Sequence, residues 1–588
     1  MKKFIDLITE EVTAAFEQAG YDPKYGKVTL SNRPDLCEYQ CNGAMAAAKA
    51  YRKAPAMIAG DVVAHLQESA VFSTAEAVNP GFINLRVNPE YLSGYLNQML
   101  ADERLSVDKV QEPKTIILDY GGPNVAKPLH VGHLRSAIIG ESIKRMGKFL
   151  GHRMIGDVHL GDWGLQMGLI ITELQERQPQ LVYFDESFTG DYPQEAPFTI
   201  GELEEIYPAA SARSKEDEEY KNRAMDATHQ LQQGRRGYMA LWKQIMNVSV
   251  TDLKKNYRRL DVDFDLWKGE SDADAYIPAM VERLKEGGYA YEDQGALVVD
   301  VKEETDTKEI PPCMILKSDG ASLYTTTDLA TLVQRMEDYH PDEILYVVDK
   351  RQELHFIQVF RCAKKTGIVD EDTKLSFLGF GTMNGKDGKP FKTREGGVMR
   401  LERLLSEITE EMYQKIVSNR SVKEEDASKT AEMVALSAVK YGDLSNQASK
   451  DYVFDTERFT SFEGNTGPYI LYTVVRIKSI LSRFAEGGGD ASLGSLLPAA
   501  GQGEKALMLL LSGFNAMVEN AFEEKAPHKI CSYIYEVANA FNSFYHETKI
   551  LSQEDETRKA SYIRLLVLAR DVLETSVELL GFAAPEKM

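Results

Sequence analysis

The stretch Pro123-Asn124-Val125-Ala126-Lys127-Pro128-Leu129-His130-Val131-Gly132-His133-Leu134-Arg135-Ser136 decides the fold of this chain. It follows an apolar run, 115–120, that is typical of a buried strand. It leads into apolar residues at helical spacing, and Gly151 then offers a helix stop. The sequence therefore predicts a strand that turns into a helix, with two histidines and a glycine at the turn.

Such a turn suits a nucleotide triphosphate. The N-terminus of a helix offers free backbone N–H groups and a partial positive charge, which favour phosphate. His130 and His133 can donate hydrogen bonds to phosphate oxygens, and Lys127 lies close enough in sequence to assist. Gly132 has no side chain, so a flat ring could lie against the backbone. Ordinary core or surface histidines also produce H-x-G-H, so the inference depends on the position at the turn.

The composition bounds the class of protein. At ~150 residues per domain, 588 residues predict roughly four domains. The sequence contains neither a secretory signal nor an apolar run long enough to span a bilayer, so we expect a soluble cytoplasmic protein without membrane contact. The cysteines show no metal-binding spacing, so we expect reduced thiols and no protein-bound metal; they are Cys37, Cys41, Cys313, Cys362 and Cys531.

The net charge of −22 argues against non-specific binding to polyanions. It leaves room for a specific RNA that binds to a local basic face. Two faces are candidates, although taken singly each fits a solvated helix surface better: Lys254, Lys255, Arg258 and Arg259 in one, Arg476 and Lys478 in the other.

Beyond residue 110, strand and helix patterns alternate, with strands expected at Arg153–Leu160, Ala296–Val301 and Glu343–Val348. Such alternation predicts a parallel sheet with crossover helices, whose ligands bind at the carboxyl ends of the strands. The chain has no G-x-G-x-x-G and no P-loop lysine motif, so dinucleotide and Walker-type sites are not supported.

The two ends of the chain have different patterns. Residues 1–110 mix helices, expected at Ala44–Ala56 and Gly60–Glu68, with a strand at Gly81–Val87. After about residue 430 the pattern is helical almost throughout, with a break at 486–490 and a Gly/Ala/Pro-rich stretch up to Gly503. We therefore expect an α+β region first and an all-α region last.

Two further segments carry chemistry. Residues 385–396 are rich in glycine and cations, and their loop places Lys389 and Lys392 three residues apart, which suits a departing pyrophosphate. Tyr324 and Asp328 stand four apart, so on a helix they share a face. A carboxylate beside a phenol suits the planar, five-donor guanidinium of arginine.

The form P-N-x-A-K-P-x-H-x-G-H-L-R-S resembles the "HIGH" signature of class I aminoacyl-tRNA synthetases, in its arginyl-tRNA synthetase version. Residues 389–393 stand where that class has its "KMSKS" loop and depart from it at Pro390 and Phe391. The resemblance covers nearly the whole chain in the right order. It implies a multidomain α/β fold with a Rossmann-like parallel-sheet catalytic core.

The resemblance also implies domain boundaries. An α+β N-terminal domain that contacts tRNA would span 1–110, and a catalytic domain with insertions 111–400, with its HIGH region at 123–133. A connector on the KMSKS side would span 401–460, and a helical anticodon-binding domain 461–588.

The function that the resemblance implies is arginine–tRNA ligation. L-arginine would react with ATP, accompanied by Mg²⁺, to give arginyl-adenylate and pyrophosphate. The arginyl group would then move to the terminal 2′-hydroxyl of tRNA(Arg) with release of AMP, and the enzyme would be a monomer. Implied residues are catalytic His130, His133, Lys127, Lys389 and Lys392; nucleotide-binding Gly132 and His355; and arginine-binding Asp119, Asn124, Glu270, Tyr324, Asp328 and Gln352.

Two other readings stay open on the sequence. One is a different adenylyl-transferring H-x-G-H enzyme, such as a cofactor nucleotidyltransferase or a synthetase for another amino acid. Nucleotidyltransferases of that kind are usually small and do not need the long helical tail. The other is a non-catalytic RNA-binding paralogue, which predicts damage to the histidine or lysine segments, and neither segment looks damaged.

Overall fold

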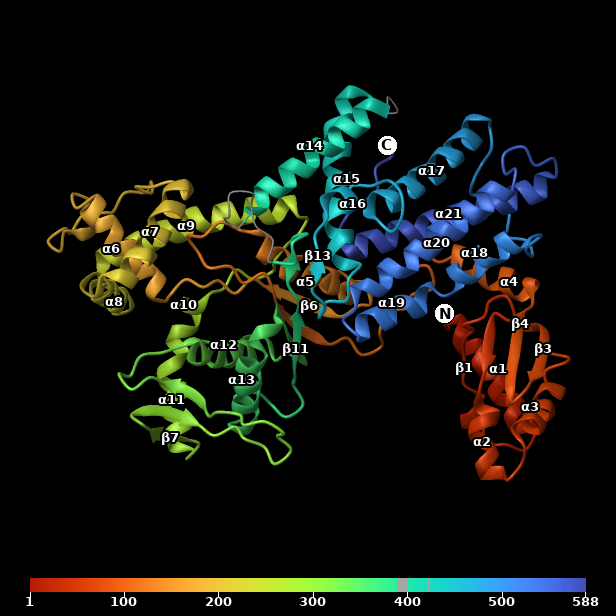
Figure 1. The fold of residues 1–588 in the computed structure, drawn as a ribbon, viewed down its shortest axis with the longest axis horizontal. Helices are drawn as coiled ribbons and strands as arrows, with labels where there is room; N and C mark the ends of the chain where they lie inside the picture. Colours follow the sequence, from red (N-terminus) through yellow and green to blue (C-terminus); the bar gives the residue numbers. More distant parts are fainter. Residues whose placement is uncertain (390–398, 420–421) are drawn as a thin grey trace.

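The structure is a computed structural model that describes residues 1–389, 399–419 and 422–588. Figure 1 shows the N-terminal region at one end of the long axis and helices α6 (Leu165–Arg177), α7 (Ile200–Glu216) and α8 (Glu218–Gln232) at the other. A parallel sheet lies between these ends. The helical C-terminal region lies beside the N-terminal region, where α18 (Gln502–Ser512) packs on α4 (Pro89–Leu100).

The N-terminal region is a four-stranded antiparallel sheet in the order β1-β2-β4-β3, flanked by helices. Its strands are β1 (Val28–Leu30), β2 (Tyr39–Cys41), β3 (Phe72–Val78) and β4 (Phe82–Val87), and its first helix is α1 (Phe4–Gln18). The two predicted helices at 44–56 and 60–68 are wrong in their bounds. The structure has α2 at Gly43–Tyr51 and α3 at Pro55–Ala64, because Arg52 ends α2 in the left-handed region and Pro55 starts α3.

The central sheet is parallel, in the order β11-β10-β5-β6, as the strand–helix alternation predicts. Its strands are β5 (Thr115–Asp119), β6 (Arg153–Asp157), β10 (Glu343–Asp349) and β11 (Lys374–Phe380). Helix α5 (Val131–Phe149) crosses from β5 to β6, and α12 (Tyr324–Tyr339) precedes β10. Polar residues at the ends of β5, β6 and β10 therefore meet at one edge.

The predicted strand at 296–301 is real but lies outside the parallel sheet. It forms β8 (Ala296–Val299) in a separate antiparallel sheet with β7 (Ala290–Asp293) and β9 (Cys313–Leu316). The turn between β7 and β8 holds Gln294 and Gly295, both at positive φ, a backbone that joins antiparallel strands in a tight hairpin.

Helices make up most of the described chain after residue 430, which confirms the helical prediction, and the break after residue 486 is also present. Further helices stand among the strands earlier in the chain. The helices are α9 (Arg236–Arg259), α10 (Glu270–Ala273), α11 (Ile277–Glu286), α13 (Glu353–Lys365), α14 (Leu401–Asn419), α15 (Glu424–Leu444), α16 (Thr456–Phe459), α17 (Gly467–Glu486), α19 (Phe514–Glu523), α20 (Pro527–Glu547) and α21 (Glu556–Leu580). No helix in the described ranges is both long enough and apolar enough to cross a membrane. All five cysteines are buried free thiols, as expected.

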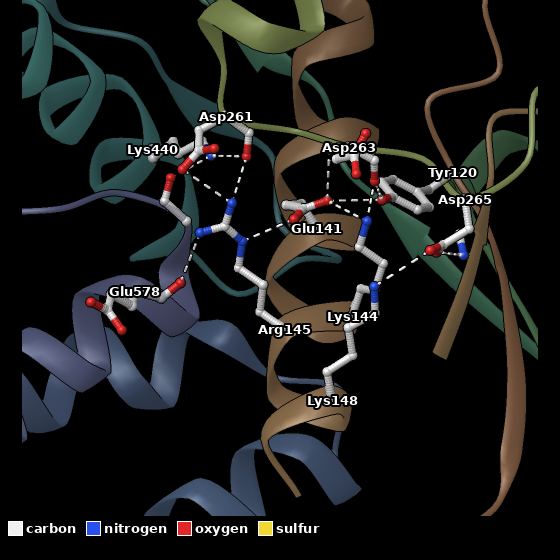
Figure 2. A network of polar contacts seen from close by, with 12 residues as sticks. Tyr120, Glu141, Lys144, Arg145, Lys148, Asp261, Asp263, Asp265, Lys440 and Glu578 are labelled. Atoms are coloured by element: carbon white, nitrogen blue, oxygen red, sulfur yellow. Dashed lines mark hydrogen bonds and ion pairs between the residues drawn. The ribbon is translucent and has the colours of Figure 1, made fainter. Parts of the chain in front are cut away.

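A polar network fixes the far end of α5 to the end of the C-terminal region (Figure 2). The Arg145 guanidinium pairs with Glu141 at 2.9 Å and donates to the carbonyls of Asp261 at 2.8 Å and Glu578 at 3.1 Å. Lys440 of α15 donates to the carbonyl of Gly581 at 2.6 Å. Because the last carbonyls of a helix lack partners within it, these donors satisfy the end of α21. Helix α5 is thereby attached to α15 and α21.

Lys440 should make stability depend on pH. Burial, and then the positive charge of Arg145, lower its pKa to about 7, whereas an unfolded lysine has a pKa near 10.4. The unfolded chain therefore binds more protons between these values, so the folded state gains stability from this group as pH rises above 7. We expect wild type to gain up to about 1.4 kcal/mol per pH unit relative to Lys440→Met between pH 7 and 9.

The measurement is chemical denaturation of both proteins at pH 7, 8 and 9. The difference between them isolates Lys440, because every other group titrates in both. A constant difference across the three pH values would contradict the lowered pKa of Lys440.

Candidate functional site

Two histidines cap the first turn of α5. His130 is the N-cap residue, and its Nδ1 accepts a hydrogen bond from the Gly132 N–H at 3.0 Å. The Nδ1 of His133 accepts from the His130 N–H at 3.3 Å, and the two rings lie 3.9 Å apart. This is a capping box made by imidazoles, which satisfies backbone donors that the first turn leaves free.

These bonds fix the tautomer of each ring, and burial keeps both rings neutral. Burial and then the charge of His130 lower the pKa of His133 to about 3, and burial and then Lys127 lower the pKa of His130. Both rings are therefore neutral at pH 7. Since each Nδ1 is an acceptor, each proton is on Nε2. The turn therefore presents two neutral Nε2–H donors to a ligand.

A cavity of about 420 Å³ opens beside the histidines. It is lined by the ends of β5, β10 and β11 and by the first turn of α5, which is where ligands bind to open parallel sheets. Five of the predicted site residues line this cavity: Asp119, His130, Gly132, His133 and Gln352. A Cβ added at Gly132 would come within 2.7 Å of the His130 ring. A side chain there would displace the histidine that caps the helix.

Both described ends of the lysine segment lie beside this cavity. Thr382 and Met383 line it before the segment, and after the segment the Met399 carbonyl accepts from the Val131 N–H at 3.1 Å. Lys389 is exposed. Lys392 lies outside the described residues. The described residues on both sides of the lysine segment therefore lie close to the histidine cavity.

Lys127 points elsewhere in this structure. Its ammonium lies 4.6 Å from the ring centre of Tyr207 on α7, and it does not line the cavity. Lys386, at the start of the lysine segment, pairs with Asp455 at 3.3 Å.

Asp119 belongs to a buried ion network. The guanidinium of Arg335, on α12, donates to Asp119 at 2.6 Å, to Asp157 at 2.9 Å and to the hydroxyl of Tyr346 at 3.2 Å. Arg335 is only 2% exposed. Burial raises the pKa of Asp119, and the guanidinium opposes that rise. Arg335 therefore joins β5, β6 and β10 at the edge that carries the cavity.

A second cluster of acidic residues, Glu270 and Asp328, lies near the Asp119–Arg335 network. Asp328 of α12 is hydrogen-bonded to His355 Nε2 at 2.5 Å. The pKa of Glu270 is raised to about 7, mainly by burial and to a smaller extent by the charges of Asp162 and Asp328, against an opposing effect of His159. Tyr324 begins α12 and is 71% exposed. Asp328, Glu270 and Tyr324 thus form a group of acceptors with one free phenol, and His355 lies with them and outside the histidine cavity.

Asn124 lies in the loop after β5, beside the loop that follows β6. It forms a β-bridge with Gly161, where an added Cβ would come within 2.1 Å of the Asn124 side-chain oxygen. The absence of a side chain at Gly161 therefore leaves space for the Asn124 amide.

Sequence patterns did not predict a role for Arg335 or His159. Arg335 is 216 residues from its partner Asp119, so no local pattern links them. His159 follows β6 directly beside the segment Gly161-Asp162-Trp163-Gly164, and that position is the one signal that could have found it.

A second cavity, of about 760 Å³, lies in the helical region. The guanidinium of Arg476 lies 4.8 Å from the Tyr472 ring and 5.8 Å from the Tyr545 ring. It also donates to Asn542 at 2.8 Å, and the Asn542 amide donates to Tyr469 at 2.9 Å. Aromatic rings, a guanidinium and an amide are groups that stack on and hydrogen-bond to unpaired bases.

The other predicted basic residues are mostly paired. Lys478 is bonded to Glu574 and Glu586, both at 2.6 Å. Lys255 pairs with Glu402 at 3.1 Å, and Arg259 donates to Ser406 at 3.1 Å. Of the two predicted faces, Arg476 is the cation that lines a cavity.

A parallel sheet with this histidine turn, followed by a helical domain, is the architecture of class I aminoacyl-tRNA synthetases. The family model described as "tRNA synthetases class I (R), catalytic domain" matches residues 95–456. The "DALR anticodon binding domain" matches 470–588, and the "Arginyl tRNA synthetase N terminal domain" matches 2–87. The chain belongs to the arginyl-tRNA synthetase family.

Similar proteins agree with this assignment. Curated arginine–tRNA ligases of Agathobacter rectalis and Alkaliphilus oremlandii are 66% and 58% identical, each over the whole of both chains. The arginyl-tRNA synthetase structure of Plasmodium falciparum matches at 25% identity with a TM-score of 0.82, over the whole of both chains. The Thermus thermophilus structure, at 22% identity and a TM-score of 0.79 over both chains, shows the same fold.

Proposed function

We infer that this enzyme is an arginine–tRNA ligase that forms arginyl-adenylate from L-arginine and ATP and then esterifies tRNA(Arg). The observation that carries the proposal is the pairing of two sites at one edge of the sheet. Neutral imidazole donors lie at the start of α5, and an acidic group with a phenol lies at the starts of α10 and α12. The first suits phosphate and the second suits a guanidinium.

The histidine turn would hold ATP. The Nε2–H groups of His130 and His133 donate to phosphate oxygens, and the N-terminus of α5 adds its partial positive charge. Because Gly132 has no side chain, it would let the base lie against the backbone. Neutral imidazoles keep donating across the physiological pH range because neither needs to gain or lose a proton.

The chemistry then needs positioning and charge stabilisation. The carboxylate of arginine attacks the α-phosphorus in line, the bond to pyrophosphate breaks, and no covalent bond to the protein is needed. Lys389 and Lys392 would neutralise the leaving pyrophosphate, because the ends of their segment lie beside the histidines. Mg²⁺ would arrive with ATP as part of the substrate. Lys127 would have to leave Tyr207 to share this load.

The acidic group would bind the side chain of arginine. Asp328 and Glu270 offer carboxylate oxygens and Tyr324 a phenol, which together match the five donors of a guanidinium. Asp119 and Gln352 line the cavity beside the histidine turn, and Asn124 is bridged to Gly161 beyond β6. These three residues would hold the amino and carboxylate groups of arginine next to ATP.

The cavity around Arg476 would receive an unpaired base of the tRNA. This gives the helical region a role in choosing tRNA(Arg) that fits its DALR match. We propose that the enzyme acts as a cytoplasmic monomer, because one chain supplies every residue of both sites.

The direct test is ATP–pyrophosphate exchange with each of the twenty amino acids, with and without total tRNA. We expect exchange with L-arginine only, and only when tRNA is present. Strong exchange with lysine would contradict the guanidinium site, and full exchange without tRNA would contradict the dependence on tRNA.

Glu270 should make the binding of arginine depend on pH. Its pKa of about 7 means that it is protonated, and neutral, at lower pH. A neutral carboxyl loses its charge-assisted bond to the guanidinium, which is worth about 1.5–3 kcal/mol. We therefore expect the KM for arginine to rise as pH falls from 8 to 6, while the KM for ATP does not follow it.

Glu270→Gln provides the matched control. It should show a high arginine KM at every pH in this range, because its side chain cannot ionise. If Glu270→Gln kept the pH dependence of wild type, another group would be responsible and the assignment would fail.

A further inference from the structure

His159 lies at the carboxyl end of β6, two residues beyond the strand. Its backbone has a φ of 41°, in the left-handed region that residues other than glycine seldom adopt. The Asp157 carboxylate accepts from the His159 N–H at 3.2 Å, and its other oxygen accepts from Arg335 at 2.9 Å. The ion network at the sheet edge therefore also holds this unusual backbone.

Neither ring nitrogen of His159 is satisfied. Both are buried, and neither has a hydrogen-bond partner within the described parts of the chain. Buried polar atoms are nearly always paired, so an orphaned imidazole needs an explanation. Strained backbone and unpaired polar groups tend to occur together at ligand sites, where the ligand supplies the missing partner.

The charged neighbours of His159 are carboxylates. The imidazole influences the pKa of Asp119, Asp162 and Glu270. The first is paired with Arg335, and the second accepts from Ser271 at 2.5 and 3.0 Å. Among the described residues, Glu270 accepts a single long bond of 3.4 Å from the Trp163 N–H. The His159 ring and the Glu270 carboxylate thus both have free hydrogen-bonding capacity.

We propose that His159 is a specificity-determining residue that contacts bound arginine, accepting a hydrogen bond from the cationic substrate beside Glu270. This assignment rests on the proposed function. A neutral imidazole adds an acceptor without adding negative charge to a site that already holds Asp119, Asp162, Glu270 and Asp328. A further carboxylate here would raise the pKa values of its neighbours and weaken their pairing with the substrate.

The test compares the arginine and ATP KM values of His159→Asn and His159→Phe in pyrophosphate exchange. Asparagine tolerates the left-handed region well, and phenylalanine keeps a ring without nitrogens. We expect both variants to raise the KM for arginine roughly 10- to 100-fold, the effect of one lost bond to a charged group, and to leave the KM for ATP unchanged.

His340→Asn is the matched control. His340 also has a left-handed φ, of 44°, but it is exposed at the end of α12. It should change neither KM, which separates the effect of the backbone from that of the site.

Two outcomes would overturn the proposal: an unchanged arginine KM in both His159 variants, or an equal rise in both KM values with a lowered melting temperature. Failure of the proposed function is a separate result, since wild type would then show no arginine-dependent exchange at all.

Discussion

The buried contact of Arg335 with Asp119 and Asp157 is the interaction on which the site depends. One guanidinium joins the carboxyl ends of three neighbouring parallel strands through these two carboxylates and the Tyr346 hydroxyl. Two carboxylates this close would repel each other without a cation between them. Because α12 carries both Arg335 and Asp328, the same helix that neutralises the sheet edge also places the acidic group that would bind arginine.

Helix α5 connects the parallel sheet to the helical C-terminal region. Its first turn holds the neutral histidines, and near its far end Arg145 donates to the Glu578 carbonyl of α21 (Figure 2). Lys440 of α15 donates to the carbonyl of Gly581, just beyond α21. A charged group buried in this way costs desolvation that an apolar side chain would avoid. The position of the histidine turn is therefore tied to the position of the helical region that carries the Arg476 cavity.

The sequence predicts local features well and long-range pairings not at all. The turn at 123–136, the strands at 153 and 343 and the helical tail follow from periodicity, and the structure confirms them. The alanine-rich run near residue 50 misled because a single left-handed residue, Arg52, ends one helix early. The predicted strand at 296 is present, but it pairs with the neighbouring strand β7 in a separate antiparallel sheet. Periodicity predicts a strand without predicting its partner. The partners Arg335 and His159 depend on which strand ends the topology brings together.

The most direct test of this account is the rate of arginine-dependent ATP–pyrophosphate exchange in Arg335→Met. Arg361→Met is the control, because Arg361 also pairs with a carboxylate, Asp306 at 2.7 Å, but lies away from the sheet edge. If Arg335 positions the strand ends, the folded Arg335→Met enzyme should lose about 10²-fold in rate, the scale expected when reacting groups are misplaced by an ångström, while the control keeps its rate. A folded Arg335→Met enzyme with the wild-type rate would contradict the account.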